Sequence, residues 1–185
     1  MHISSIEFSS LSDVANLDGI RIKAFDPNEL VAGDKSYNPK TRNYFRYLYR
    51  KFGPASLSRI PPILVYREEH DYDFTPFVLD GNHRAEAAFF CQKPILGIII
   101  ERQEDVKACK RYMTDLSLPK YIYPDISTSL WCLLGSKYLD IEEIKEEVQK
   151  RLAEQNIPGC DFRTYGQFTE IRYQRNPLSM GMYMR

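Results

Sequence analysis

The residues best suited to chemistry stand together where an apolar segment ends, in the run "FVLDGNHR" of residues 77–84. Asp80 supplies a carboxylate, His83 an imidazole and Arg84 a guanidinium, while Gly81 lets the backbone approach a ligand without a Cβ in the way. The Ala-rich residues that follow favour a helix, whose first N–H groups lack helical partners and attract anions. The run therefore predicts an anion-binding corner between a strand and a helix.

Each side chain of this corner has a role that its chemistry allows. Arg84 can fork onto phosphate oxygens, and His83 can donate a hydrogen bond or transfer a proton. Asp80 could hold a metal ion, orient His83 or accept a hydrogen bond from a ribose hydroxyl. The alternative is a capped turn, in which Asp80 or Asn82 accepts from helix N–H groups and Arg84 is solvated.

Apolar patterning around the corner predicts the elements that position it. Residues 61–67 and 75–80 are typical of neighbouring strands, and residues 83–92 of a helix. Residues 95–101 form a continuous apolar strand of the kind that is buried on both faces. Two short strands are expected earlier, in residues 2–8 and 19–25, and a further helix in residues 103–113. The pattern indicates an α/β (α+β) protein with a mixed sheet and packed helices.

A basic stretch without any acidic residue runs from Lys35 to Arg67. It contains a predicted helix in which Asn38 can cap and Pro39 suits the first position. Three arginines spaced four residues apart form a stripe on that helix: Arg42, Arg46 and Arg50. Such a stripe could contact a nucleic-acid backbone, and a phosphate-facing role explains the same arginines equally well.

The whole sequence has the composition of one soluble domain, with 185 residues and 25 basic against 25 acidic side chains. A Pro- and Tyr-containing connection predicts a boundary that separates a domain over residues 1–115 from a helical extension over residues 116–185. The clearest helix of the extension spans residues 140–155, where Asp140 and Glu143 resemble a capping box. The acid-rich turn at residues 68–73 could bind a divalent ion or be a solvated hairpin tip.

Cellular location is inferred from what the sequence lacks. It does not open with a basic segment followed by an apolar run, and its most apolar stretch, residues 94–100, is far too short to span a bilayer. The four cysteines form no CxxC pair, which favours free thiols in a reducing compartment. We therefore expect a cytoplasmic protein without a membrane partner. No P-loop, GxGxxG, HExxH or GxSxG pattern occurs.

The segment "DGNHRAEAA", residues 80–88, resembles the DG-x-HR-x-x-AA signature of the ParB/sulfiredoxin-like superfamily. The order of segments from Ile20 to Arg102 is similar too: "NPKTRNYF", a helix, "KFG", "PPILVYR", the signature and "ILGIIIE". The resemblance implies a compact fold that binds a nucleoside triphosphate, ATP or CTP, with Mg²⁺ at the corner. Members include partition-type CTPases, ATP-using sulfiredoxins, a free-serine kinase and small proteins credited with ATPase and DNase activities.

The resemblance also implies roles for particular residues. The phosphate and nucleotide contacts would come from Gly81, Asn82, His83 and Arg84, with Asp80, His83 and Arg84 as the catalytic group and Asp80 as the metal ligand. Lys40 and Arg42 stand in "NPKTR", which is similar to the arginine-bearing loop that closes over the triphosphate in partition proteins.

Two departures narrow the activity that the resemblance implies. Sulfiredoxins carry a reactive cysteine where this chain has Asn82, so reduction of a sulfinic acid is not expected. The extension is too short for the helix-turn-helix and dimerisation domains of a partition protein.

The leading hypothesis is a nucleotide-binding NTPase or small phosphotransferase. One alternative is a nucleic-acid-binding module, with or without nuclease activity, that uses Arg42, Arg46 and Arg50. The other is a non-catalytic regulator in which nucleotide binding changes an interface, with the C-terminal extension available to a protein partner.

Overall fold

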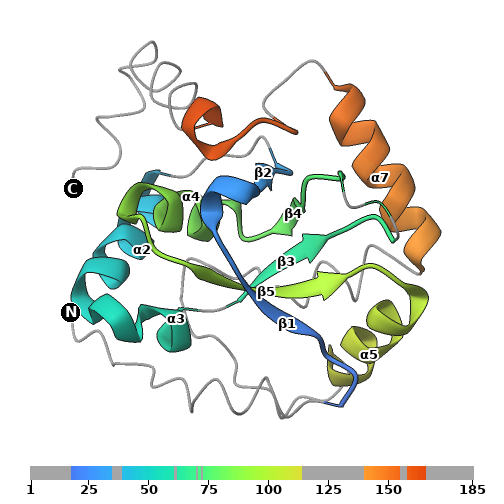
Figure 1. Ribbon diagram of the computed structural model, residues 1–185, viewed down its shortest axis with the longest axis horizontal. Helices are drawn as coiled ribbons and strands as arrows, with labels where there is room; N and C mark the ends of the chain where they lie inside the picture. The colour runs from blue at the N-terminus through green and yellow to red at the C-terminus, as the bar shows by residue number, and fades with distance from the viewer. Residues whose placement is uncertain are drawn as a thin grey trace.

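The computed structural model describes residues 18–34, 39–60, 62–69, 71, 73–113, 140–154 and 158–165. Within them lies one mixed sheet of five strands, in the order β1-β5-β3-β4-β2 (Figure 1). Neighbours β3 and β5 are parallel, as are β2 and β4, whereas β1 with β5 and β3 with β4 are antiparallel. The expected mixed α/β class is confirmed. The strands are β1 Ile22–Phe25, β2 Val31–Ala32, β3 Ile63–Tyr66, β4 Phe77–Asp80 and β5 Ile95–Ile100.

Helices cover both faces of this sheet, with α2, α3 and α4 on one side and α5 and α7 on the other (Figure 1). Short 3-10 segments, η1 and η2, follow β1 and α2. The bounds are η1 Pro27–Glu29, α2 Pro39–Phe52, η2 Gly53–Ala55, α3 Ser56–Arg59, α4 Asn82–Cys91, α5 Gln103–Met113 and α7 Ile141–Ala153. No described helix is both long and apolar enough to cross a membrane.

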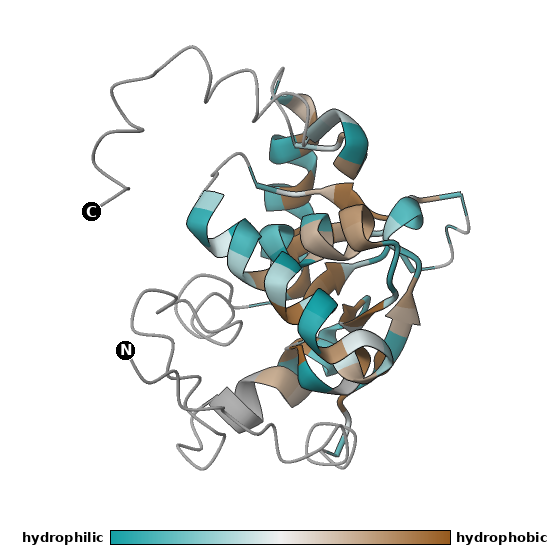
Figure 2. Cartoon of the chain, turned by 90° about the vertical axis from the view of Figure 1, so that its left-hand side faces the viewer, coloured by the Kyte–Doolittle hydropathy of each residue, from teal (hydrophilic) through white to brown (hydrophobic). Residues whose placement is uncertain are grey.

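Alternation along the central strands produces two hydrophobic cores. In β3, Ile63 and Val65 pack beneath α2 and α4, whereas Leu64 and Tyr66 point to the face covered by α5 and α7. All four residues of β3 and all six of β5 are buried, as the continuous apolar pattern predicts. Figure 2 shows the hydrophobic residues gathered on the sheet and on the inner sides of the helices. The residues that follow the parallel strands β3 and β5 lie at one end of this close-packed layer, and those that follow β4, which is antiparallel to β3, lie at the other.

The described residues of the C-terminal part contribute to both cores. Asp140 caps α7 by accepting a hydrogen bond from the Glu143 amide at 3.0 Å, as the sequence predicts. Residues 158–165 run beside β2, where the Ala32 amide donates to the Cys160 carbonyl at 2.8 Å. The predicted boundary between residues 115 and 116, and the strand expected in residues 2–8, lie outside the described residues.

Packing of α7 on the sheet can be tested by truncating its central buried side chain. Ile144 is fully buried in the core beneath α5 and α7. We expect Ile144→Ala to lower the free energy of unfolding by about 2–5 kcal/mol, since it removes transfer free energy and leaves a cavity. Urea denaturation measures this change. The control is Gln149→Ala on the exposed face of α7, which should change stability by less than about 0.5 kcal/mol. Equal, small effects of both substitutions would contradict this packing.

Candidate functional site

The predicted corner begins at the last residue of β4 and ends in the first turn of α4. Gly81 has φ 94° and ψ 25°, a left-handed conformation that side chains other than glycine rarely adopt. A Cβ at this position would lie 2.6 Å from the Ile63 Cγ2 and 2.7 Å from the Arg84 Nη2. Glycine is therefore required both by the turn and by the guanidinium folded over it. Gly81 is the N-cap residue of α4, so the cap position itself supplies no side-chain acceptor.

Arg84 forms a clamp across the corner. Its Nη2 donates to the Asp80 Oδ2 at 3.0 Å, and its Nη1 donates to the Pro62 carbonyl at 3.1 Å. The residue is only 8% exposed, so the alternative of a solvated arginine is wrong. Burial raises the pKa of the Asp80 carboxyl, and this effect outweighs the opposing influence of the Arg84 charge. The clamp ties α4 to the end of β4 and to the entry of β3.

Asn82 faces the protein interior. Its Oδ1 accepts a hydrogen bond from the Gly33 amide at 2.9 Å, in a buried setting. The Gly33 carbonyl in turn accepts from Arg151 Nη1 on α7 at 2.6 Å. Gly33 has no room for a side chain, because a Cβ would lie 1.9 Å from the Val78 carbonyl oxygen. The amide side chain predicted to contact phosphate thus holds the turn after β2 against α4.

Asp34 is the member of the site that the sequence reasoning missed. It follows Gly33, and its negative charge adds to the raised pKa of Asp80 and opposes the lowering of the His83 pKa. The only local signal was a Gly-Asp pair after a very short apolar segment, which is common in loops. The hydrogen bond from Gly33 to Asn82 brings this carboxylate to the corner.

His83 is partly buried at the start of α4. Burial lowers the pKa of its imidazole to about 4, and the charges of Arg84 and Arg42 add to this effect while Asp34 opposes it. The imidazole is therefore neutral at pH 7, and it can both donate and accept a hydrogen bond. As predicted, the corner combines an imidazole and a guanidinium, but the imidazole is not a cation.

Arg42 lies behind this turn, on α2. It is 8% exposed, and its Nη1 lies 3.7 Å from the Oε1 of the fully buried Glu86 on α4. Glu86 is therefore buried beside Arg42 and does not face the solvent. Lys40, two residues earlier on α2 in the same "NPKTR" segment, is exposed.

The predicted arginine stripe is divided among three environments. Arg42 is buried as described, and the Arg46 guanidinium stacks over the Phe90 ring at 4.1 Å. Arg50 is exposed. A continuous basic surface over these three positions is therefore not formed.

Asp80 and the turn at residues 68–73 are the two metal sites that the sequence offers. In the part of the chain that the structure describes, no three His, Cys, Asp or Glu side chains are grouped as ligands. His70 lies outside that part. Mg²⁺ commonly uses only one or two carboxylates together with substrate phosphates, and Asp80 and Asp34, whose charges influence each other, are carboxylates of the corner.

No family model, curated protein or solved structure matches this chain. The resemblance to the ParB/sulfiredoxin-like superfamily stays a prediction from the motif.

The hydrogen bond from Gly33 to Asn82 can be tested by removing its acceptor. We expect Asn82→Ala to lower the free energy of unfolding by about 1–3 kcal/mol, because a buried amide loses its partner. Urea denaturation measures the change. The same substitution at the exposed Asn28 serves as control, with an effect below about 0.5 kcal/mol. A stability of Asn82→Ala equal to that of Asn28→Ala would show that the bond is dispensable.

The lowered pKa of His83 makes stability depend on pH. The unfolded chain takes up the proton at about pH 6.5, whereas the folded protein does so only at about pH 4. We therefore expect the free energy of unfolding to fall as pH decreases through this window, and to fall less in His83→Gln. Comparing denaturation of the two proteins at pH 7 and 5 separates this effect from that of the carboxyl groups. An NMR titration in which His83 has a pKa near its ordinary value would contradict the site geometry.

Proposed function

We propose that this protein binds a nucleoside triphosphate, ATP or CTP, with Mg²⁺ at the corner between β4 and α4, and hydrolyses it or transfers its terminal phosphoryl group. The observation that carries the proposal is the placement of Arg84 and a neutral His83 in the first turn of α4, where the charge of Arg42 also acts on the imidazole and the N-cap residue Gly81 has no side chain. Helix N-termini and guanidinium groups are the usual protein partners of phosphate oxygens.

The neighbouring residues suit the steps of phosphoryl transfer. That reaction needs mainly positioning and charge neutralisation, which the first amides of α4 and the two arginines would supply. The neutral imidazole of His83 can accept a proton from water or from an acceptor hydroxyl. Asp80 and Asp34, whose charges influence each other, would hold Mg²⁺ together with the phosphates.

The ParB/sulfiredoxin-like fold is part of this proposal. Its support is the DGNHR sequence at a strand-to-helix corner, the left-handed Gly81 and the mixed sheet that carries them. Asn82 in place of a reactive cysteine argues for nucleotide chemistry without sulfinic acid reduction. The nucleic-acid alternative loses support, because Arg42 is buried and Arg46 stacks on Phe90.

Calorimetric titration of ATP and CTP with Mg²⁺ tests the binding step. Truncating Arg84 to alanine would leave Asp80 buried without its clamp, so we choose Arg84→Lys, which keeps the positive charge. We expect micromolar binding to the wild type and a loss of about ten- to a hundredfold in this variant, since lysine cannot make the forked contact. Release of inorganic phosphate then distinguishes an NTPase from a regulator that only binds.

The matched control is Arg50→Lys, the same substitution at an exposed position of α2, which should leave affinity unchanged. Thermal melting confirms that both variants are folded. Failure of the folded wild type to bind either nucleotide would overturn the proposed function.

A further inference from the structure

An arginine joins helix α7 to the candidate site. Arg151 lies in the last turn of that helix, with only 13% of its side chain exposed, and its Nη1 donates to the Gly33 carbonyl at 2.6 Å. Gly33 precedes Asp34, whose charge acts on Asp80 and His83. The C-terminal part of the chain therefore contacts the backbone directly beside a residue of the corner, although the two segments are 118 positions apart in the sequence.

Gly33 passes this contact on to α4. Its amide donates to the buried Oδ1 of Asn82 at 2.9 Å, and Asn82 is the first residue of α4. Helices α7 and α4 cover opposite faces of the sheet, so the connection between them runs around its edge strand, β2 (Figure 1). Arg151, the backbone of Gly33 and Asn82 thus form a series of hydrogen-bonded groups that leads from α7 to the first turn of the site.

The guanidinium of Arg151 is itself held in place. Its Nε donates to the Oε1 of Glu147, one helical turn earlier, at 2.9 Å. An arginine near the end of a helix usually serves its own helix through such a partner. Here the same planar group uses a second donor on a distant segment, so its geometry is set from both sides. Arg151 is therefore a fixed donor for the Gly33 carbonyl.

The turn after β2 depends on side chains because the sheet pairing ends before it. Strand β2 pairs with β4 only over Val31 and Ala32. On the other edge of β2, the Ala32 carbonyl accepts from the Gly159 amide at 2.6 Å. The hydrogen bonds of Gly33 to Arg151 and Asn82 extend this attachment by one residue, up to the start of Asp34. Since a peptide group is planar, the direction of the Gly33 carbonyl also sets the plane of the Asp34 amide.

We propose that Arg151 is a positioning residue of the corner, which holds the turn of Gly33 and Asp34 against α4 and thereby sets the affinity of the site for its ligand. The inference rests on the proposed function for that ligand, a nucleoside triphosphate with Mg²⁺. It goes beyond that function in giving α7, on the other face of the sheet, control over the site.

The effect on affinity follows from how Asp34 acts. Its carboxylate influences Asp80 and His83 through charge, an interaction that weakens as the groups move apart. A carboxylate that shares Mg²⁺ with ligand phosphates also has to stand in one geometry, which neighbouring hydrogen bonds secure. Loss of the Arg151 contact therefore loosens the turn and weakens ligand binding, although Arg151 itself touches no ligand.

Amide hydrogen exchange in the full chain without ligand, followed by ¹H–¹⁵N NMR, tests the positioning step. The variant is Arg151→Met, which keeps the length of the side chain and removes its donors. We expect the Gly33 amide to exchange at least about tenfold faster relative to the amide of Ile99, a buried residue of β5, because the turn opens locally. Ile144→Ala weakens the packing of the same helix without touching the turn, and it should not raise this ratio.

Calorimetric titration of the same proteins with ATP and CTP in the presence of Mg²⁺ tests the consequence for the site. We expect Arg151→Met to weaken binding by about three- to thirtyfold. Arg151→Lys, which can still donate to the Gly33 carbonyl, should lose less. Lys150→Met, at the exposed neighbouring position, and folded Ile144→Ala should bind as the wild type does.

Two results would each overturn the inference. One is an unchanged ratio of Gly33 to Ile99 exchange in Arg151→Met, and the other is unchanged nucleotide affinity in that variant. If the folded wild type binds neither nucleotide, the proposed function fails, whereas the exchange ratio still decides whether Arg151 holds the turn.

Discussion

The clamp formed by Arg84 over Gly81 is the contact on which the rest of the corner depends. One guanidinium joins the carboxylate at the end of β4 to the carbonyl that precedes β3, and it fits only because Gly81 has no Cβ. Removing one partner of such a buried ion pair typically costs about 3–5 kcal/mol. The clamp sets where α4 begins, and that start in turn places Asn82 against Gly33 and Glu86 near Arg42. The residues of the candidate site are thus part of the framework that holds the fold together.

This dual role shapes the electrostatics of the corner. Its two arginines lie beside Asp80 and Glu86, so an anionic ligand has to share cations that already have carboxylate neighbours. Burial keeps His83 neutral by lowering its pKa, and the charges of the same two arginines act in the same direction. A site of this kind contributes preorganised dipoles and a proton acceptor more than it contributes net positive charge. Phosphoryl transfer, in which a neutral base and fixed donors are both useful, fits that balance better than simple anion storage.

Local patterns predict the elements of this fold, whereas contacts between distant segments decide its site. Continuous apolar residues located β3 and β5, and Asp140 correctly marked the start of α7, because each signal acts within a few residues. The spacing of Arg42, Arg46 and Arg50 correctly placed them on one helix, but it could not show that α4 packs there and buries Arg42. The sequence did not predict Asp34 as part of the site, nor the hydrogen bond from the Gly33 amide to Asn82. Both depend on β2, which is only two residues long and therefore leaves no periodic pattern.

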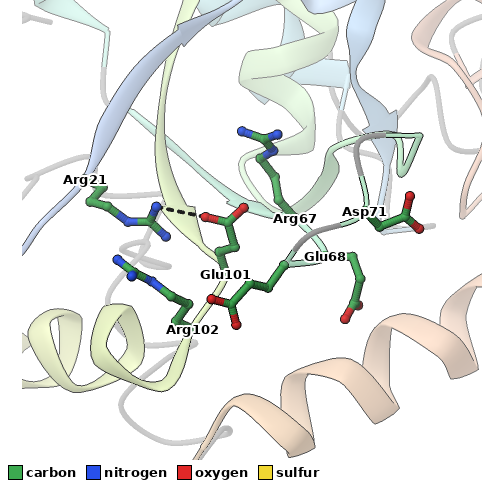
Figure 3. A pocket seen from close by; sticks show the side chains of 7 residues that line it. Arg21, Arg67, Glu68, Asp71, Glu101 and Arg102 are labelled. Carbon is green, nitrogen blue, oxygen red and sulfur yellow. Dashed lines mark hydrogen bonds and ion pairs between the residues drawn. The ribbon is translucent and has the colours of Figure 1, made fainter.

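The antiparallel pairing of β3 with β4 places the corner at one end of the sheet and a charged pocket at the other. It places the end of β4, with Asp80, beside the start of β3, and it leaves the end of β3 free to open beside the end of β5. The two ends of the sheet differ in how their charges are arranged. At the corner the arginines lie against carboxylates in the interior, whereas the pocket of about 230 Å³ beyond β3 and β5 is lined by arginine and carboxylate side chains together (Figure 3). Because β3, which runs between them, is completely buried and close-packed, the two ends of the sheet are held at a fixed separation.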